Sequence, residues 1–377
     1  MAHGGDRYRN RVEYDFSINV NPLGMPEVLR KALMCGIENA GFYPDPRQEA
    51  VRQAAALFYG ERARTELSPE WVIPGNGASE LITAVMQVLR PKNVLLPVPC
   101  FTGYSHAAYG ITFTDKAEKI MIREYQTQEK RGFQPFSDFL AEFMDHTSKE
   151  TDLLILANPC NPGGMMMDYQ VLRAILKAAA WRHIPVLLDE CFFEFTVRKE
   201  ESGLRLQEEY SNLLVLRAFT KIFAMPGVRL GCLFCRDEEL GERIRRALPE
   251  WNLSSFAEAV MISAGKQRRR LYGFLDKTVR ETASLRESML RRIEGISADR
   301  NRKITTFPSV SNFLLTTGWG MPGKTLAGEL LKRGILVRCC GDMSPLNDDY
   351  IRLAVRPEEE QDKLFEALYA CLKQEIK

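Results

Sequence analysis

The chain has 377 residues, 45% of them hydrophobic and 27% charged, a balance typical of a globular protein with room for two domains. Its 51 basic and 49 acidic residues nearly cancel to +2, which disfavours nucleic-acid binding because that function needs a strongly basic face. No apolar run reaches the roughly 18 residues that span a membrane, so a membrane protein is also disfavoured. Nine cysteines without a secretion signal favour reduced thiols and a cytoplasmic location. The four histidines are scattered, so we expect no histidine-based metal site.

Short apolar runs alternate with amphipathic stretches from about residue 70 to about residue 245. Several runs are apolar on both alternating faces, as strands covered on both sides must be. The pattern predicts an α/β sheet with mostly parallel strands. The predicted strands are Trp71–Pro74, Asn93–Pro97, Asp152–Ala157, Pro185–Asp189, Leu213–Phe219 and Val228–Cys235, and the predicted helices are Ala78–Leu89, Tyr169–Arg182 and Glu238–Ala247.

The pattern changes after about residue 250, where a long helix is predicted over Arg268–Ile296. Strand-like segments follow at Ser311–Thr316, Ile335–Arg338 and Tyr350–Val355, and a terminal helix follows from Pro357. This order predicts a smaller α+β domain. We expect an N-terminal segment (1–40) that packs with the small domain (256–377), a large α/β domain (41–255), and a ligand site at the domain interface.

A glycine-rich turn, Pro74-Gly75-Asn76-Gly77-Ala78-Ser79-Glu80, follows a predicted strand and opens a predicted helix. Free amides at a helix N-terminus bind phosphate, so Gly77, Ala78 and Ser79 are candidates for a phosphate cradle. The Gly-x-Gly core also begins a dinucleotide fingerprint, but Glu80 stands where the third glycine belongs. A nicotinamide-dependent oxidoreductase therefore stays as a disfavoured alternative.

Three further candidates follow predicted strands. Asp189 ends its strand, where a carboxylate faces the ligand crevice of a parallel sheet, although a capping or turn carboxylate is the alternative. Asn161 lies in the loop Asn158-Pro159-Cys160-Asn161-Pro162, which could also be a plain turn. Phe101 could stack on a planar ligand or be an ordinary core aromatic.

Lys221 follows an apolar strand-like run, and Arg229 comes eight residues later, after a Pro-Gly turn. A lysine amine can form a Schiff base with a carbonyl or with pyridoxal phosphate (PLP), and a nearby arginine can bind phosphate. Taken alone, such a lysine is usually a solvated surface charge. Cys232-x-x-Cys235 lies on a predicted strand, whose alternation puts the two thiols on opposite faces and disfavours a disulfide or chelate.

These segments, taken together and in this order, resemble those of the fold-type I PLP-dependent enzymes over nearly the whole chain. Within that class the chain resembles the histidinol-phosphate aminotransferase group and its L-threonine-O-3-phosphate decarboxylase branch. The finer resemblance rests on His3-Gly4-Gly5, on the segment from Asp15 to Gly24, on Tyr43-Pro44-Asp45, and on the run from Leu216 to Gly231.

The resemblance implies a large domain with a mostly parallel seven-stranded sheet and PLP as cofactor. PLP would be bound covalently by Lys221, paired at its ring nitrogen with Asp189, contacted at its 3-oxygen by Asn161 and stacked on Phe101. Its phosphate would be held by Ala78, Ser79, Thr220 and Arg229. Tyr43 would reach the phosphate of a neighbouring subunit, which implies a homodimer.

The resemblance also implies substrate contacts. Arg352 would bind the substrate carboxylate, and Asn21 would lie near the substrate. Candidates for a second, substrate-phosphate site are Arg338, Arg356 and His3, although the alternatives are a surface cation for Arg338 and a disordered terminus for His3. The substrate expected is a small phosphorylated amino acid or amino alcohol.

Several positions depart from the usual pattern of the group: Gly163 and Ala218 replace hydroxyl residues, Phe192 replaces a tyrosine, and Cys191 and Cys232 replace other common residues. The activity expected is decarboxylation of L-threonine O-3-phosphate to (R)-1-aminopropan-2-yl phosphate in cobalamin biosynthesis. The first alternative is an aminotransferase such as one acting on histidinol phosphate. A further alternative is a protein of this fold that binds PLP without turning over any amine.

Overall fold

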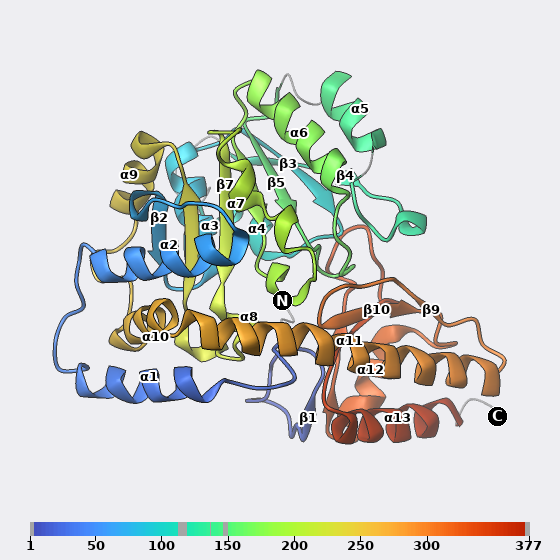
Figure 1. Cartoon of the computed structure of the whole chain (residues 1–377). Coiled ribbons are helices and arrows are strands. Elements are labelled where there is room, and N and C mark those ends of the chain that lie inside the picture. The colour runs from blue at the N-terminus through green and yellow to red at the C-terminus, as the bar shows by residue number, and fades with distance from the viewer. Residues whose placement is uncertain (1–3, 112–118, 136, 146–149, 374–377) are drawn as a thin grey trace.

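The computed structural model describes residues 4–111, 119–135, 137–145 and 150–373 (Figure 1). Its centre is a seven-stranded sheet in the order β2-β8-β7-β6-β5-β3-β4. Strand β8 runs antiparallel to both of its neighbours, and the remaining pairs are parallel, which confirms the predicted sheet. The strands are β2 (Val72–Gly75), β3 (Asn93–Val98), β4 (Met121–Gln126), β5 (Leu153–Ala157), β6 (Val186–Asp189), β7 (Leu213–Ala218) and β8 (Gly231–Cys235).

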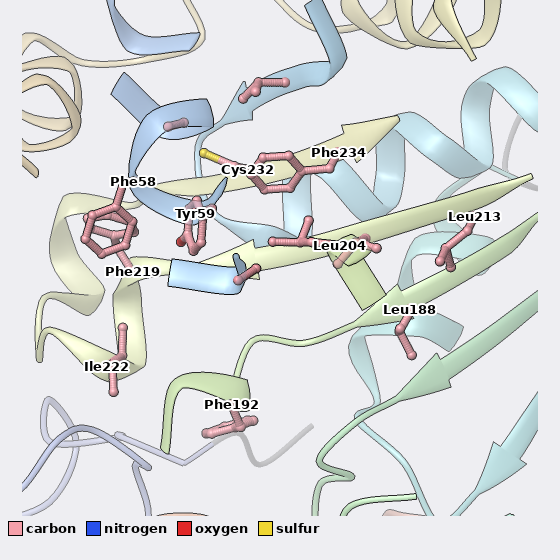
Figure 2. Close-up of a cluster of buried hydrophobic side chains, with 14 of the residues drawn as sticks. Phe58, Tyr59, Leu188, Phe192, Leu204, Leu213, Phe219, Ile222, Cys232 and Phe234 are labelled. Atoms are coloured by element: carbon pink, nitrogen blue, oxygen red, sulfur yellow. The ribbon is translucent and has the colours of Figure 1, made fainter. Parts of the chain in front are cut away.

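Helices cover both faces of this sheet. Successive strand residues point to opposite sides, and in the central strands both sides are apolar and must be buried. Val186 and Leu188 of β6 belong to one buried cluster, part of which Figure 2 shows, and Leu187 belongs to another. Cys232 and Cys235 likewise lie in different clusters, as the strand assignment predicts. The first cluster is built on α2 (Glu49–Ala63), α5 (Ser137–Asp145), α6 (Tyr169–Trp181) and α10 (Ser255–Lys266), and the second on α3 (Ala78–Leu89), α4 (Gly103–Ile111) and α9 (Glu238–Ala247).

A smaller unit follows, with an antiparallel sheet in the order β12-β13-β10-β9 and a separate parallel pair, β1 with β11. Its own core contains Trp319, Phe365 and the second half of the long helix α11. The elements are β1 (Tyr14–Asp15), β9 (Thr305–Thr306), β10 (Phe313–Thr317), β11 (Ile335–Leu336), β12 (Arg338–Cys339), β13 (Ile351–Ala354), α11 (Arg268–Asp299), α12 (Gly323–Leu331) and α13 (Glu358–Lys373).

Helix α11 runs along the boundary between the two units (Figure 1). Leu271 and Leu275 in its first half pack in the large-unit core, whereas Met289 and Ile293 pack in the small-unit core. Helix α1 (Glu27–Glu38) packs against α10, where a side chain on Gly36 would come within 2.9 Å of the Phe256 backbone. The domain boundaries at residues 40 and 255 stay a prediction. Helix α11 packs in both cores, and the N-terminal segment contacts both units through β1 and α1.

The structure corrects several predicted boundaries. Pro226–Val228 form a 3₁₀ turn, so β8 begins at Gly231 rather than at Val228, because Arg229 adopts a left-handed backbone with φ of 57° that a strand cannot continue. The segment predicted as one strand at Ile335–Arg338 is split between β11 and β12, which pair with different partners. Within the described ranges, no helix combines the length and apolarity needed to cross a membrane.

Candidate active site

A cavity of about 260 Å³ opens at the carboxyl edge of the large sheet, where the small unit meets it. Ala157, Asp189 and Ala218, the last residues of β5, β6 and β7, all line this cavity. Ligands bind at this edge of open α/β sheets. The residues predicted from the sequence that line it are Ala78, Ser79, Phe101, Asn161, Asp189, Thr220, Lys221, Arg229, Arg338 and Arg352.

Lys221 lies on the short helix α8 (Phe219–Ile222), which follows β7 directly. Burial, together with the positive charges of Arg352 and Arg229, lowers the pKa of its amine to about 8, although Cys191 acts in the opposite direction. Desolvation and like charge both favour the neutral amine. A neutral amine is the form that attacks a carbonyl carbon, so the site supplies a lysine suited to covalent chemistry.

Asn21 fixes the backbone around Lys221 by hydrogen bonds. Its backbone amide donates to the Lys221 carbonyl oxygen (2.9 Å), and its side-chain amide donates to the Ile222 carbonyl oxygen (2.7 Å) and to Thr278 Oγ1 (2.9 Å). Asn21 is not among the cavity-lining residues. The structure therefore gives this residue a positioning contact with Lys221, and its proximity to substrate stays a prediction.

Asp189 has both carboxylate oxygens engaged. Tyr104 Oη donates to Oδ2 (2.6 Å), and the Cys191 amide donates to Oδ1 (2.9 Å). Hydrogen bonds to both oxygens fix the orientation of the carboxylate. Tyr104 is buried in the first turn of α4, three residues after Phe101, whose ring it contacts edge-on at 5.6 Å. Tyr104 was not predicted as a site residue, because Phe101 precedes α4 and no helical pattern links the two residues.

Residues close in sequence to Asp189 and Lys221 form a buried network of ion pairs. Arg217 of β7 pairs with Glu190 (2.6 Å) and Glu194 (3.0 Å). Arg62 pairs with Glu194 (3.3 Å), so one carboxylate joins two arginines. Because Glu190 follows Asp189 and Arg217 precedes Lys221 by four residues, this network ties together the strand ends that carry the site.

A corner of the cavity suited to an anion lies where β2 leads into α3. Gly77 caps the helix with φ of 83°, and a Cβ there would lie 2.4 Å from Arg229 Nη2. Its own amide donates to the Gly75 carbonyl oxygen (2.7 Å), so in this structure Gly77 supplies space for the guanidinium rather than a free amide. Ala78, Ser79 and Thr220 line the cavity beside Arg229, so this corner combines a helix N-terminus with one cation.

Arg352 of β13 enters the cavity from the small unit. It is 6% exposed, and it donates to Asn161 Oδ1 and to the Ser17 carbonyl oxygen (2.8 Å). Its Nε has no hydrogen-bond partner among the described residues. Burial lowers its pKa to about 10, chiefly because the charged form is desolvated. A buried guanidinium with neutral acceptors and a vacant donor is suited to binding a carboxylate.

Arg338 of β12 also lines the cavity, but its charge is already compensated. Its Nη2 donates to both carboxylate oxygens of Asp342 (2.7 Å each), and its Nη1 donates to the Cys339 carbonyl oxygen (2.7 Å). The arginine side chain is 7% exposed and the aspartate side chain 36% exposed. Arg338 is therefore not the surface cation that the sequence left open, and Asp342 was missed.

The remaining predicted residues lie elsewhere. Arg356 pairs with Glu360 (2.9 Å) at the start of α13 and does not line the cavity, so the structure gives no support to a phosphate contact there. Tyr43 is 81% exposed in the connection between α1 and α2, where its ring packs on Trp251 at 4.7 Å. His3 lies outside the described residues.

Two departures noted in the sequence have a structural basis. A side chain on Gly163 would meet Cys160 Sγ at 2.8 Å and the Gly132 carbonyl oxygen at 2.9 Å, so this loop has no room for the hydroxyl residue common in the group. Phe192 lines the cavity with its ring edge against Phe313 (5.1 Å) and presents no hydroxyl.

Residues 12–368 match the family model of aminotransferase class I and II. The chain belongs to this family. It is 31% identical to a putative threonine-phosphate decarboxylase from Caldanaerobacter subterraneus, over 97% of this chain and 92% of the relative, and 27% identical to the threonine-phosphate decarboxylase of Salmonella typhimurium, over 94% and 90%. It also spans 38% of a longer bifunctional adenosylcobalamin biosynthesis protein from Leptospira interrogans, at 29% identity. A crystal structure of histidinol-phosphate aminotransferase from Clostridium acetobutylicum superposes with a TM-score of 0.82 at 25% identity, covering 96% of this chain and 99% of that one.

Enzymes of the aminotransferase class I and II family depend on PLP, and the residues of this cavity fit that cofactor. The space that Gly77 leaves for Arg229 and the adjoining helix N-terminus suit a phosphate group. The Lys221 amine, with its lowered pKa, suits the aldehyde carbon, and the fixed carboxylate of Asp189 suits a protonated ring nitrogen. The chain is accordingly a PLP-dependent enzyme of the decarboxylase and aminotransferase group.

Proposed function

We propose that this enzyme decarboxylates L-threonine O-3-phosphate to (R)-1-aminopropan-2-yl phosphate, a reaction of cobalamin biosynthesis. The observation that carries the proposal is the pair of buried arginines, Arg352 and Arg338, that line one cavity with Lys221. A substrate with a carboxylate and a phosphate needs two cationic positions beside the reactive lysine. The named threonine-phosphate decarboxylases among the relatives support the same substrate class.

In this proposal Lys221, Asp189, Asn161, Phe101, Ala78, Ser79, Thr220 and Arg229 hold PLP, with Gly77 making room for the Arg229 guanidinium. When bound, PLP supplies an electron sink for the bond that breaks at the substrate α-carbon. Tyr104 and the Cys191 amide fix the orientation of the Asp189 carboxylate. Asn21 holds the backbone of Lys221, and Lys221 moves a proton at the α-carbon after the bond has broken.

The choice of bond depends on how the substrate carboxylate is held. Arg352 is anchored by Ser17 and Asn161, so its guanidinium has a defined direction. If Arg352 holds the substrate carboxylate in the orientation that the bound cofactor activates, the carboxylate would be lost as CO2, whereas a hydrogen held in that orientation would lead to amine transfer. Small differences in orientation therefore separate the two activities.

Amine transfer from histidinol phosphate to a keto acid is the second candidate. The fold similarity to the Clostridium histidinol-phosphate aminotransferase and several relatives named for that activity favour it. A relative named L-serine phosphate decarboxylase, 26% identical, supports serine phosphate as another substrate of the first activity.

We also propose that the enzyme is a homodimer in which Tyr43 reaches the PLP phosphate of the neighbouring subunit. In one chain the Tyr43 ring is largely exposed, together with Phe42 on the same connection and Met34 and Ile37 on α1. An exposed apolar group of this kind marks a protein interface. Sedimentation of the purified protein as a monomer would contradict this part of the proposal.

The proposal is tested by adding L-threonine O-3-phosphate to the PLP-loaded protein without any keto acid and analysing the products by mass spectrometry. We expect loss of CO2 and formation of the aminopropanol phosphate. Unchanged substrate would reject the decarboxylase, and conversion of histidinol phosphate in the presence of 2-oxoglutarate would then establish the aminotransferase.

A further inference from the structure

Arg352 and Arg338, the two cavity arginines contributed by the small unit, differ in how their charge is balanced. Arg352 donates to neutral oxygens of Asn161 and Ser17, so no carboxylate compensates its charge through these contacts. Arg338 donates to both oxygens of the Asp342 carboxylate at 2.7 Å. The charge of Arg352 is therefore not compensated by these contacts, whereas Arg338 is already paired with a carboxylate.

Asp342 reaches Arg338 from outside the cavity. Its side chain lines a neighbouring open cleft of about 830 Å³, whereas Arg338 lines the cavity itself, and Met343 lines both. His106, Lys119, Glu124 and Ser344 also line the cleft, and Ser344 Oγ donates to Glu124 at 2.6 Å. A ligand in the cavity can approach Arg338 while Asp342 stays on the far side.

The arginine keeps donor capacity for such a ligand. A guanidinium has five N–H groups. Asp342 and the Cys339 carbonyl engage Nη2 and one hydrogen of Nη1. The remaining hydrogens, on Nη1 and Nε, can serve a ligand without breaking the ion pair.

We propose that Asp342 tunes the anion affinity of Arg338 and so sets how tightly the cavity holds the second anionic group of its substrate. The inference rests on the proposed function in that it takes this group to be the substrate phosphate. A carboxylate behind the arginine repels an anion in front of it, and the repulsion grows with the charge of the ligand. The Asp342–Arg338 pair therefore weakens binding of the substrate phosphate, whereas binding of the substrate carboxylate by Arg352 is not weakened.

Removal of the Asp342 charge should strengthen the binding of an anion at Arg338. Asp342→Asn keeps the size of the side chain and removes its charge, so the positive potential of Arg338 in the cavity rises. A dianion gains more from this change than a monoanion of the same shape. Asp342 is partly exposed, so solvent screens the effect, and we expect about threefold tighter binding per ligand charge.

The test uses calorimetric titration of the PLP-loaded full chain at pH 8 with n-propyl phosphate and n-propyl sulfate. Both ligands present a tetrahedral oxyanion, with charges of about −2 and −1 respectively at this pH. In Asp342→Asn we expect the dissociation constant to fall about tenfold for the phosphate and about threefold for the sulfate. Asp349→Asn removes the same charge from the same loop without a contact to Arg338 and should change neither value by more than about twofold.

Weaker binding of propyl phosphate to Asp342→Asn would overturn the inference, because it would show that Asp342 orients Arg338 rather than opposing the ligand. Equal binding to Asp342→Asn and the wild type would overturn it as well. In the double variant Arg338→Gln/Asp342→Asn the gain should disappear, and a gain that persists would place the anion elsewhere and reject the assignment.

Failure of the proposed function gives a different pattern. If the wild type neither releases CO2 from L-threonine O-3-phosphate nor transfers the amine of histidinol phosphate, the proposed function fails. The charge-dependent gain in Asp342→Asn can still be measured with the alkyl ligands, so the two claims are judged separately.

Discussion

Arg352 of the small sheet donates a hydrogen bond to Asn161 Oδ1 in the loop after β5. The two residues are 191 positions apart in the chain and belong to different units. One is our candidate for the substrate carboxylate and the other for the cofactor 3-oxygen. A change at Arg352 therefore removes a cation from the cavity and also frees the side-chain oxygen of Asn161, the residue that we propose contacts the cofactor.

Replacement of Arg352 by lysine keeps a charge but loses the forked contact with Asn161 and Ser17. We expect kcat/KM to fall by about 100-fold, equivalent to about 3 kcal/mol for lost charge-assisted hydrogen bonds. Steady-state kinetics with L-threonine O-3-phosphate checks this. Arg356→Lys is the matched control, since that arginine pairs with Glu360 away from the cavity, and an equal loss there would contradict the separation of roles.

Tyr104→Phe removes the hydroxyl that donates to Asp189 Oδ2 and leaves the ring in place. We expect PLP to bind about fivefold more weakly, and the free energy of unfolding to fall by about 1 kcal/mol, because a buried carboxylate loses a donor. Cofactor affinity is measured by fluorescence titration of the apoprotein. Tyr369→Phe provides the comparison, because Tyr369 donates to Asp299 at the exposed surface of the small unit. An unchanged PLP affinity in Tyr104→Phe would argue against positioning of Asp189 by Tyr104.

The lysine pKa has a consequence for stability. Lys221 titrates at about 8 in the folded apoprotein, against 10.5 for the ordinary side chain. The unfolded chain thus binds more protons than the folded chain between these two pH values. Lys221 therefore lowers the free energy of unfolding by its maximal contribution below pH 8, and it makes no such contribution above pH 10.5. Lys221→Met should raise the stability of the apoprotein by about 3 kcal/mol at pH 7.

The measurement is urea denaturation of wild-type and Lys221→Met apoprotein at pH 7 and at pH 10. The difference between the two proteins should shrink as the pH rises through this interval. A difference that is independent of pH would show that the lysine is not held as a desolvated cation.

Gly77→Ala tests the phosphate corner. The added Cβ would lie 2.4 Å from Arg229 Nη2, and the φ of 83° is one that alanine disfavours. Because the arginine can move, we expect a modest loss of about 1 kcal/mol in stability but at least a tenfold loss of PLP affinity. Gly227→Ala lies on the turn just before Arg229 with nothing within 4 Å of the new atom, so it should bind PLP as the wild type does. Equal affinity in the two variants would remove Arg229 from the cofactor site.

Much of the large unit was predictable because its central strands are apolar on both faces. Helices α3 and α9 were predicted with the bounds that the structure has. Strand β4 was missed, since Met121–Gln126 lies at the sheet edge with its side chains partly exposed and carries no continuous apolar run. Helix α4, which carries Tyr104, was missed because it has two glycines and no charged face.

The candidate site was predictable where one residue follows one strand, as Asp189, Asn161 and Lys221 do. Relations between distant segments were not. The pairing of Asp342 with Arg338 depends on a loop fold, and the contact of Gly77 with Arg229 depends on a left-handed residue inside a segment that reads as strand. The hydrogen bonds of Asn21 to the backbone around Lys221 likewise join segments about 200 residues apart. Sequence periodicity does not predict such a contact.

Covalent binding of PLP by Lys221 is tested most directly by reduction of the PLP-loaded enzyme with borohydride, followed by proteolysis and mass spectrometry of the peptides. We predict a single phosphopyridoxyl adduct on the peptide that contains Lys221, and none in Lys221→Met. An adduct on another lysine, or loss of the yellow colour without any adduct on Lys221, would contradict the assignment of this cavity as the cofactor site.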